Sequence, residues 1–310
     1  MAVGCAPTSL RRESLMSSTA TDLDVPTCHV VRLNPHRWNG RTIVMTHGAW
    51  HSGRHYLSTL DDRPGWAYDF ALAGYRVLVA DYPGTGASPP MAHPERIDSE
   101  YICRGLARVV ESAGGPVDLL VHSMSGPYGY TLLETHGHLI RSLVAVSPSV
   151  PPELGRRPDS WADLGDSIRT VYGGVPWEFP KSGWTRGDAA FVANWIGPGS
   201  RFPAVERSTY VATLSPLRSE LSAEWLRDVL DPPTRVPELD GGNVLVLLGT
   251  HDVGHPRELG DQLVTWLTEH GAVAELLYLG DRGIDGNGHM LMLEENSSDI
   301  ARVIMDWIER

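Results

Sequence analysis

Short apolar runs along the chain alternate with longer segments in which apolar residues recur every three or four positions. The short runs predict strands, at Thr27–Leu33, Thr42–Thr46, Tyr75–Ala80, Val117–Val121, Ile140–Val146, Val244–Gly249 and Val273–Leu279. Most of them are apolar at nearly every position, and glycine or proline bounds several. This pattern is typical of strands that are buried on both faces, as in a parallel sheet.

The longer segments predict helices between the strands. They are Trp66–Ala73, Ser99–Ser112, Gly126–Thr135, Arg257–His270 and Ser298–Ile308. In the last of them, Ile300, Val303, Ile304 and Ile308 form one apolar stripe at helical spacing. Strands and helices in alternation predict an α/β protein with a mostly parallel central sheet and helices on both faces.

The segment 151–241 breaks this rhythm, because it has no strong strand and many proline and glycine residues. It also holds half of the ten tryptophans, Trp161, Trp177, Trp184, Trp195 and Trp225. We expect it to form a cap, or lid, over the carboxyl ends of the sheet, where α/β proteins bind ligands. It is inserted between strands 6 and 7 of the expected fold, which are the runs Ile140–Val146 and Val244–Gly249. The core is then 25–150 and 242–310. Residues 1–24 are predicted to be a disordered tail, with Met1 or Met16 as the start.

Composition narrows the class of partner. Of the 310 residues, 42% are hydrophobic and 21% are charged, which is ordinary for a globular enzyme. The formal net charge of -12 disfavours nucleic acids and anionic membranes as partners. No apolar run approaches the roughly 20 residues that cross a bilayer, so we expect no membrane segment. Three scattered cysteines, Cys5, Cys28 and Cys103, favour a reducing compartment, and we expect a cytoplasmic protein.

The sharpest chemical signal is Ser123, which follows the run Asp118–His122 and precedes the small residues Ser125 and Gly126. A buried strand, a tight turn and a helix in this order are typical of a nucleophile elbow, which exposes one serine hydroxyl at the start of a helix. The ideal elbow has glycine at positions 121 and 125, whereas this chain has Val121 and Ser125. A serine that only caps the following helix is the alternative.

A base and an acid follow at the places that such an elbow requires. His289 lies in the loop Gly286–Met292 between the last strand and the last helix, and its flanking glycines permit tight turns. Asp252 lies just past the penultimate strand, so the chain order is Ser, Asp, His. We expect Asp252 to hold the His289 ring and to stabilise its protonated form. A surface histidine and a turn aspartate are the alternatives without chemistry.

The loop after the second predicted strand would supply hydrogen-bond donors for an oxyanion. We expect the backbone N–H groups of Ala49 or Trp50, together with that of Met124, to form an oxyanion hole. His47 is expected to brace this loop. Three tryptophans are expected to bind substrate: Trp50, Trp177 and Trp184.

Two other patterns are weaker. His251, His255 and His289 suggest a metal site, but no helix aligns the first two, and we expect no metal. The sequence Gly84-Thr-Gly86 after a strand suggests a dinucleotide turn, but the third glycine is absent. We therefore expect no cofactor.

From about Thr27 to Arg310, the order of these segments resembles the α/β-hydrolase superfamily. Four stretches resemble, more narrowly, a group of bacterial serine esterases: Asp62–Trp66, Asp81–Ser88, His122–Gly126 and Gly286–Met290. The resemblance implies the α/β-hydrolase fold, a nucleophile at Ser123 and a base at His289. Some members of the group carry the acid as a glutamate after the sixth strand. This chain has Ser147 there, so Asp252 is the expected acid.

These features predict a serine hydrolase that cleaves a carboxylic ester or lactone of a small, largely apolar metabolite through an acyl-enzyme on Ser123. A lyase or acyl-transfer enzyme that uses the same residues is the alternative, and a ligand receptor without catalysis is a third hypothesis. The expected partner is a small ester-like molecule, and a homo-oligomer stays open. Activity is expected to fall as His289 takes up a proton, around pH 6–7.

Overall fold

The computed structural model describes residues 10–16, 25–187, 200–205, 207–235 and 237–310. Cys5 and Trp195 lie outside these residues. The main sheet contains β1 (Arg11–Met16), β2 (His29–Asn34), β3 (Thr42–Thr46), β4 (Arg76–Asp81), β5 (Val117–His122), β6 (Ile140–Val146), β12 (Asn243–Leu248) and β13 (Val273–Tyr278). The helices that pack on it are α1 (Arg54–Leu57), α2 (Trp66–Leu72), α3 (Ser99–Ser112), α4 (Ser125–His136), α8 (Arg257–Glu269) and α9 (Ser297–Ile308). Short 3-10 helices are η1 (Pro94–Arg96), η2 (Gly137–Leu139), η3 (Pro152–Leu154), η4 (Leu279–Arg282) and η5 (Leu291–Leu293).

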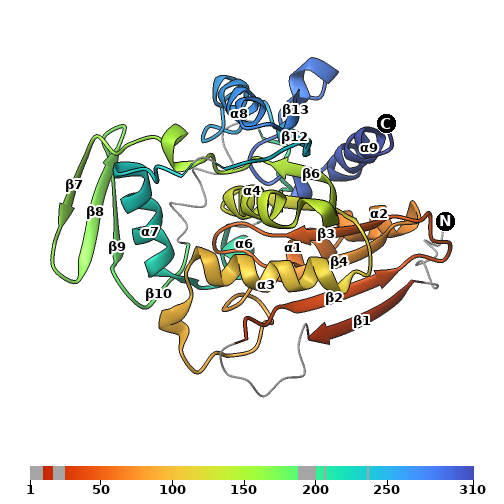
Figure 1. Ribbon diagram of the computed structural model, residues 1–310, viewed down its shortest axis with the longest axis horizontal. Helices are drawn as coiled ribbons and strands as arrows, with labels where there is room; N and C mark the ends of the chain where they lie inside the picture. The colour runs from red at the N-terminus through yellow and green to blue at the C-terminus, as the bar shows by residue number, and fades with distance from the viewer. Residues whose placement is uncertain (1–9, 17–24, 188–199, 206, 236) are drawn as a thin grey trace.

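The strands of the main sheet lie in the order β1-β2-β4-β3-β5-β6-β12-β13 (Figure 1). β1 pairs antiparallel with β2, and β2 pairs antiparallel with β4. The other neighbours are parallel. Every strand predicted from the sequence is present, with bounds within two residues of those expected. The predicted α/β class with a mostly parallel sheet is therefore confirmed.

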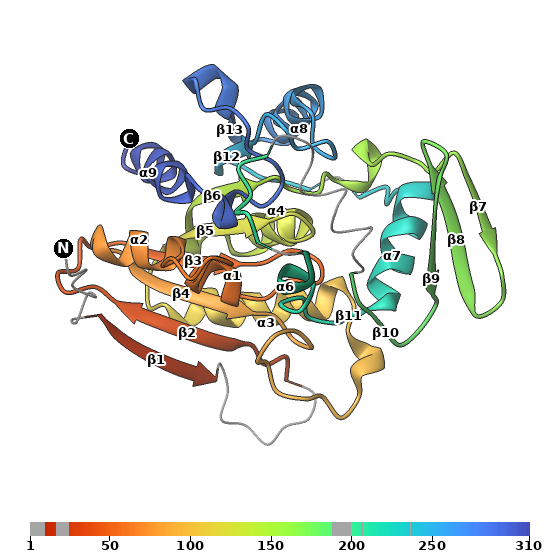
Figure 2. The ribbon, with the colours of Figure 1, turned by 180° about the vertical axis from the view of Figure 1, so that it is seen from behind.

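Successive side chains of the central strands pack into two cores on opposite faces of the sheet. On β3, Val44 belongs to one core, whereas Ile43 and Met45 belong to the other. Helices α3, α4 and α8 cover the first face, and α2 and α9 cover the second (Figure 2). All five residues of β3 are buried, which explains its uninterrupted apolar run. Within the described part of the chain, no helix is both long and apolar enough to cross a membrane.

The segment Arg11–Met16 differs from its expectation. It forms β1, which pairs antiparallel with β2 from Arg11 opposite Asn34 to Met16 opposite His29. The prediction of a disordered tail over 1–24 is wrong for these residues and stays a prediction for the others. A polar strand can form here because β2 would otherwise present unpaired backbone groups at the sheet edge. Its exposed side chains at 11–14 explain why no apolar run marks it.

Between β6 and β12 the chain leaves the main sheet, but the expectation that it has no strong strand there is wrong. β7 (Ser160–Asp163), β8 (Ser167–Tyr172) and β9 (Val175–Pro180) form a three-stranded antiparallel sheet. The rest of the segment contains the two-stranded pair β10 (Trp184–Thr185) and β11 (Leu217–Arg218), with helices α6 (Arg207–Val211) and α7 (Ser219–Leu230).

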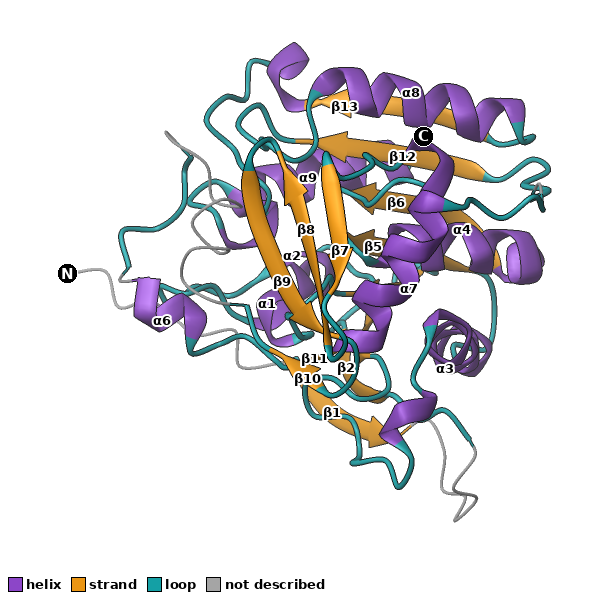
Figure 3. Cartoon of the chain, turned by 90° about the vertical axis from the view of Figure 1, so that its left-hand side faces the viewer, coloured by secondary structure: helices purple, strands orange, loops and turns teal. Residues whose placement is uncertain are grey.

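The sheet β7–β9 lies at one end of the molecule, with α7 between it and the main sheet (Figures 1 and 2). Figure 3 shows its strands from the outer side. They are largely exposed and so have no continuous apolar run. The missed signal is the turn: Gly173 and Gly174 adopt φ values of 59° and 79° in the two-residue connection between β8 and β9. A lid function for this segment stays a prediction.

Candidate active site

The loops that carry the candidate residues begin at one edge of the main sheet. In the register, Thr46 of β3 pairs with Val121 of β5. Val146 of β6 pairs with both His122 of β5 and Leu247 of β12. The carboxyl ends of these parallel strands are therefore level. The predicted oxyanion loop, elbow and acid loop all start there, side by side.

Ser123 occupies a strained turn between β5 and α4. Its φ is 53°, a left-handed conformation that costs a residue with a side chain about 1–3 kcal/mol. Backbone hydrogen bonds hold it there, because the Ser123 carbonyl accepts the N–H groups of Gly126 and Ser149, each at 2.8 Å. Such a turn, with a helix directly behind it, is the local geometry of a nucleophile elbow.

The two departures from the ideal elbow are accommodated by neighbouring residues. A glycine, Gly129 of α4, lies against the side chain of Val121. A Cβ there would be 3.1 and 3.2 Å from the two Val121 methyl carbons. Helix and strand therefore approach closely without a glycine at position 121. Ser125 is completely buried, and its hydroxyl donates to the carbonyl of His47. This hydrogen bond ties the start of α4 to the loop after β3.

The loop after β3 passes directly against the elbow. A Cβ on Gly48 would lie 2.7 Å from the Ser123 Cβ, so only glycine permits this contact. Ala49 and Trp50 are buried, and Trp50 has a φ of 56°. Met124 is the N-cap residue of α4, at the positive end of the helix dipole. The amides predicted as oxyanion donors thus belong to residues beside Ser123.

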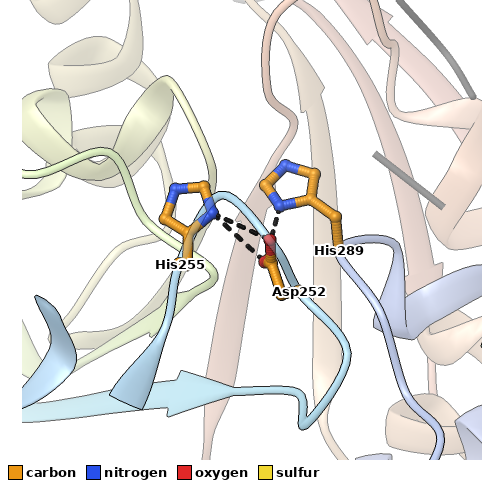
Figure 4. A group of neighbouring side chains, drawn as sticks. All are labelled: Asp252, His255 and His289. Atoms are coloured by element: carbon orange, nitrogen blue, oxygen red, sulfur yellow. Dashed lines mark hydrogen bonds and ion pairs between the residues drawn. The ribbon is translucent and has the colours of Figure 1, made fainter. Parts of the chain in front are cut away.

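His289 and Asp252 meet in a buried hydrogen bond (Figure 4). Nδ1 of His289 donates to Oδ2 of Asp252 at 2.8 Å, and the two residues are 1% and 5% exposed. Burial alone would raise the pKa of Asp252. The charges and hydrogen bonds of His255 and His289 outweigh burial and hold the pKa well below its ordinary value. The carboxylate is therefore ionised and favours the His289 tautomer that carries its proton on Nδ1.

A second buried carboxylate, Glu294, holds the loop that carries His289. Its Oε1 accepts the Gly288 N–H at 2.6 Å, and its Oε2 accepts from the Asn287 amide. The Asn287 carbonyl in turn accepts the His251 N–H at 2.7 Å, which joins this loop to the loop of Asp252. Burial raises the pKa of Glu294 to about 7. No local sequence pattern marks Glu294, because its role depends on a contact within a loop of irregular structure.

Imidazoles form a continuous row that passes through His289 and ends at His255. Ring centroids are 5.0 Å apart between His55 and His51, and 6.1 Å between His51 and His122. The next steps, from His122 to His289 and on to His255, are 4.7 and 4.9 Å. Burial lowers the pKa of His51 and His122 well below the ordinary value, and that of His55 to about 3. These three rings are therefore neutral. The interval of four residues between His51 and His55 was the available sequence signal, and it marks only one step of the row.

Of the three tryptophans predicted to bind substrate, Trp50 and Trp177 contact each other, whereas Trp184 lies at an exposed position. Nε1 of Trp50 donates to Oγ1 of Thr185 at 3.1 Å, and its ring meets that of Trp177 edge to face at 6.3 Å. The cap therefore contacts the predicted oxyanion loop. Trp184 is 44% exposed, with the guanidinium of Arg218 5.1 Å from its ring centre. Substrate binding by these side chains stays a prediction.

Three side chains at the site could together ligate a cation. One ligand atom each from Asp252, His255 and His289 lies within 4.8 Å of the others. Carboxylate oxygen and imidazole nitrogen are ligands that zinc accepts. His251, the other member of the pattern seen in the sequence, instead lies 3.8 Å from Asp285. The hydrogen bonds of both imidazoles to Asp252 account for the cluster without a metal, and the expectation of no metal stays a prediction.

Comparisons with known proteins agree with this fold. The model of the alpha/beta hydrolase family matches residues 43–303. The protein named "Probable secreted lipase phiG" from a fungal species (strain ATCC 74256) is 24% identical over 324 positions, which cover 86% of this chain and 81% of that protein. A structure described as a novel bacterial esterase is 18% identical with a TM-score of 0.55, covering 97% and 93% of the two chains. A monoacylglycerol lipase from Paleococcus ferrophilus is 21% identical with a TM-score of 0.55, covering 90% and 98%.

Proposed function

The chain belongs to the α/β-hydrolase family, and we propose that it is a serine hydrolase that cleaves a carboxylic ester or lactone through an acyl-enzyme on Ser123. One observation carries this proposal. The ring of His289, which is hydrogen-bonded to the buried Asp252, lies 4.7 Å from the ring of His122, the residue directly before Ser123 and its strained turn. A serine hydroxyl needs such a base, held in one tautomer by a carboxylate, to act as a nucleophile near neutral pH.

In the proposed mechanism, Oγ of Ser123 attacks the carbonyl carbon of the substrate, and Nε2 of His289 takes the hydroxyl proton. Asp252 accepts the Nδ1–H of His289 and stabilises the imidazolium. The N–H groups of Ala49 or Trp50 and of Met124 bind the oxyanion. His289 then returns the proton to the leaving alcohol. Water, activated by His289, hydrolyses the acyl-enzyme and releases the acid.

The relatives support an ester as the substrate class, since one is named a lipase and another an esterase. The aromatic pair formed by Trp50 of the proposed oxyanion loop and Trp177 of the cap supports a small, largely apolar substrate. The cytoplasmic location expected from the sequence is also a proposal. The name of the fungal relative includes the word secreted, so secretion is the alternative that cell fractionation would test.

The test is a panel of p-nitrophenyl esters of increasing acyl length, assayed with wild type and Ser123→Ala. We expect wild-type turnover on at least the short esters and a loss of about 10³-fold or more in Ser123→Ala. Product analysis in oxygen-18 water separates the alternatives, because hydrolysis places the label in the acid, whereas elimination leaves it out of both products. Activity that Ser123→Ala retains would remove Ser123 as the nucleophile.

A further inference from the structure

A second imidazole, that of His255, binds the carboxylate of Asp252 (Figure 4). Its Nδ1 lies 3.2 Å from Oδ1 and 3.1 Å from Oδ2 of Asp252. The ring stacks on that of His289, with centroids 4.9 Å apart and an angle of 22° between the planes. Asp252 is therefore shared between two nearly parallel imidazoles, of which the mechanism uses only one.

The His255 side chain is not needed to close its own turn. The Gly254 N–H donates to Oδ1 of Asp252 at 3.1 Å, and the His255 N–H donates to the Asp252 carbonyl at 3.2 Å. These backbone groups already define the loop before α8 begins at Arg257. The side chain of His255 therefore contributes its contact with the carboxylate rather than the shape of the loop.

The surroundings of His255 leave few groups that can affect its charge. Among the residues that the structure describes, the titratable side chains that face it are Asp252, His289 and the neutral His122. The next charged side chains along the chain are Arg257, which pairs with Asp281 at 2.6 Å, and Glu258 in the first turn of α8. The small cavity on its other side is lined by apolar residues of β12, α8 and the loop after β6. With 16% of its side chain exposed, His255 can exchange protons with solvent.

We propose that His255 is a positioning residue that shares Asp252 with His289 and so sets the pH at which His289 becomes available as the base. This inference rests on the proposed function. In its neutral form, His255 donates Nδ1–H to Asp252 and keeps Oδ2 directed at His289. In its protonated form, it competes for the charge of Asp252 and places a positive charge 4.9 Å from the His289 ring.

Both effects of His255 act in the same direction on the pH profile. A shared carboxylate stabilises the His289 imidazolium less than an unshared one does, and a neighbouring cation repels it. His289 therefore remains unprotonated to lower pH, and the enzyme stays active at lower pH than it would with His289 alone on Asp252. Removal of the His255 charge is expected to raise the midpoint of the acid limb of kcat/KM by about 0.5–1 pH unit.

Two substitutions separate the charge of His255 from its hydrogen bond. His255→Asn keeps an N–H donor near the position of Nδ1 and cannot titrate. We expect it to raise the midpoint while kcat on the plateau stays within about threefold. His255→Phe keeps a ring to stack on His289 and removes both the donor and the charge. We expect a larger shift than in His255→Asn, because the carboxylate is then no longer shared. We also expect a fall in kcat of about tenfold and an unchanged KM, because Asp252 is less well held.

The control is His251→Asn, which changes a histidine of the same loop that lies beside Asp285 rather than Asp252. Its profile should match that of wild type. Titration of 15N-labelled histidines by NMR measures the same coupling without substrate: the His289 signals should titrate at higher pH in His255→Asn than in wild type. The NMR experiment tests the inference even if no ester is hydrolysed, so failure of the proposed function is distinguished from failure of this inference.

A wild-type midpoint in His255→Asn, by activity or by NMR, would overturn the proposal. So would a loss of activity in EDTA that zinc restores, since the three side chains would then act as metal ligands. A fall in kcat in both variants without any shift would reduce His255 to a structural role.

Discussion

At the residue scale, two carboxylates hold the proposed base, His289, and neither of them contacts the substrate in the proposed mechanism. Asp252 contacts the His289 ring, whereas Glu294 contacts the backbone immediately before it. Glu294 is 1% exposed, and both of its oxygens accept hydrogen bonds from the residues that precede His289. The position of the His289 ring therefore depends on a residue that does not contact the ring.

The substitution Glu294→Gln tests this dependence. A glutamine offers one acceptor and one NH2 group, so either the Gly288 N–H or the Asn287 amide loses its acceptor. We expect the free energy of unfolding to fall by about 1–3 kcal/mol and kcat to fall by about tenfold, with KM unchanged. Urea unfolding and steady-state kinetics would measure the two effects. Wild-type values of both would mean that Glu294 does not hold the loop.

At the element scale, the sequence was sufficient to predict those strands that are buried along most of their length. The strands β3 and β6 have the expected bounds, because central parallel strands are buried and apolar along most of their length. The candidate site was predictable in part for the same reason, since Ser123 and Asp252 follow such strands directly. His289 required only the position of the last strand. The segment with β7–β9 and the strand β1 were not predictable from apolar runs, because their described side chains are largely exposed.

Other features depend on contacts between distant elements and leave no local pattern. The row of imidazoles joins residues from the loop after β3, α1, the end of β5 and two later loops. In the ideal elbow, a glycine at position 121 permits the close approach of strand and helix. Here Gly129, about one turn after the start of α4, permits it instead. Neither relation follows from spacing in the sequence, because each is set by how helices and loops pack on the sheet.

The contact between the loop after β3 and the elbow gives a test at this scale. Gly48→Ala would place a Cβ 2.7 Å from the Ser123 Cβ, so the two elements must separate. We expect kcat/KM to fall at least about tenfold and the free energy of unfolding to fall by about 1–3 kcal/mol. Gly115→Ala is the matched control, because a Cβ there meets nothing within 4 Å. An effect of Gly48→Ala no larger than that of the control would contradict the close contact.

At the scale of the whole molecule, burial of neutral histidines makes stability depend on pH. Burial lowers the pKa of His47, His51, His55 and His122 in the folded chain. Each of them takes up a proton on unfolding once the pH is below about 6.5, so their contribution is complete above that pH and is lost as the pH falls. Glu294 acts in the opposite sense, because its pKa is raised to about 7, and it favours the folded state as the pH falls.

The buried histidines predict an acid-sensitive fold, although the raised pKa values of Asp69, Glu224 and Glu294 act against them. Between about pH 6 and pH 5, unfolding is expected to take up protons net, and the free energy of unfolding should fall by about 1.4 kcal/mol per pH unit for each of these protons. Urea unfolding at several pH values measures this slope, and His55→Gln should reduce it by about one proton. A free energy of unfolding that is constant between pH 6.5 and 5 would contradict the neutral, buried state of these histidines.

The central claim is that Ser123 is a nucleophile activated by His289 and Asp252. The most direct measurement is the intact mass of the protein after reaction with a fluorophosphonate, followed by peptide mapping of the modified site. We expect one phosphonyl group per chain, located on Ser123, with no labelling of Ser123→Ala and much slower labelling of His289→Gln. An unmodified wild-type protein, or a label that persists in Ser123→Ala, would contradict the account.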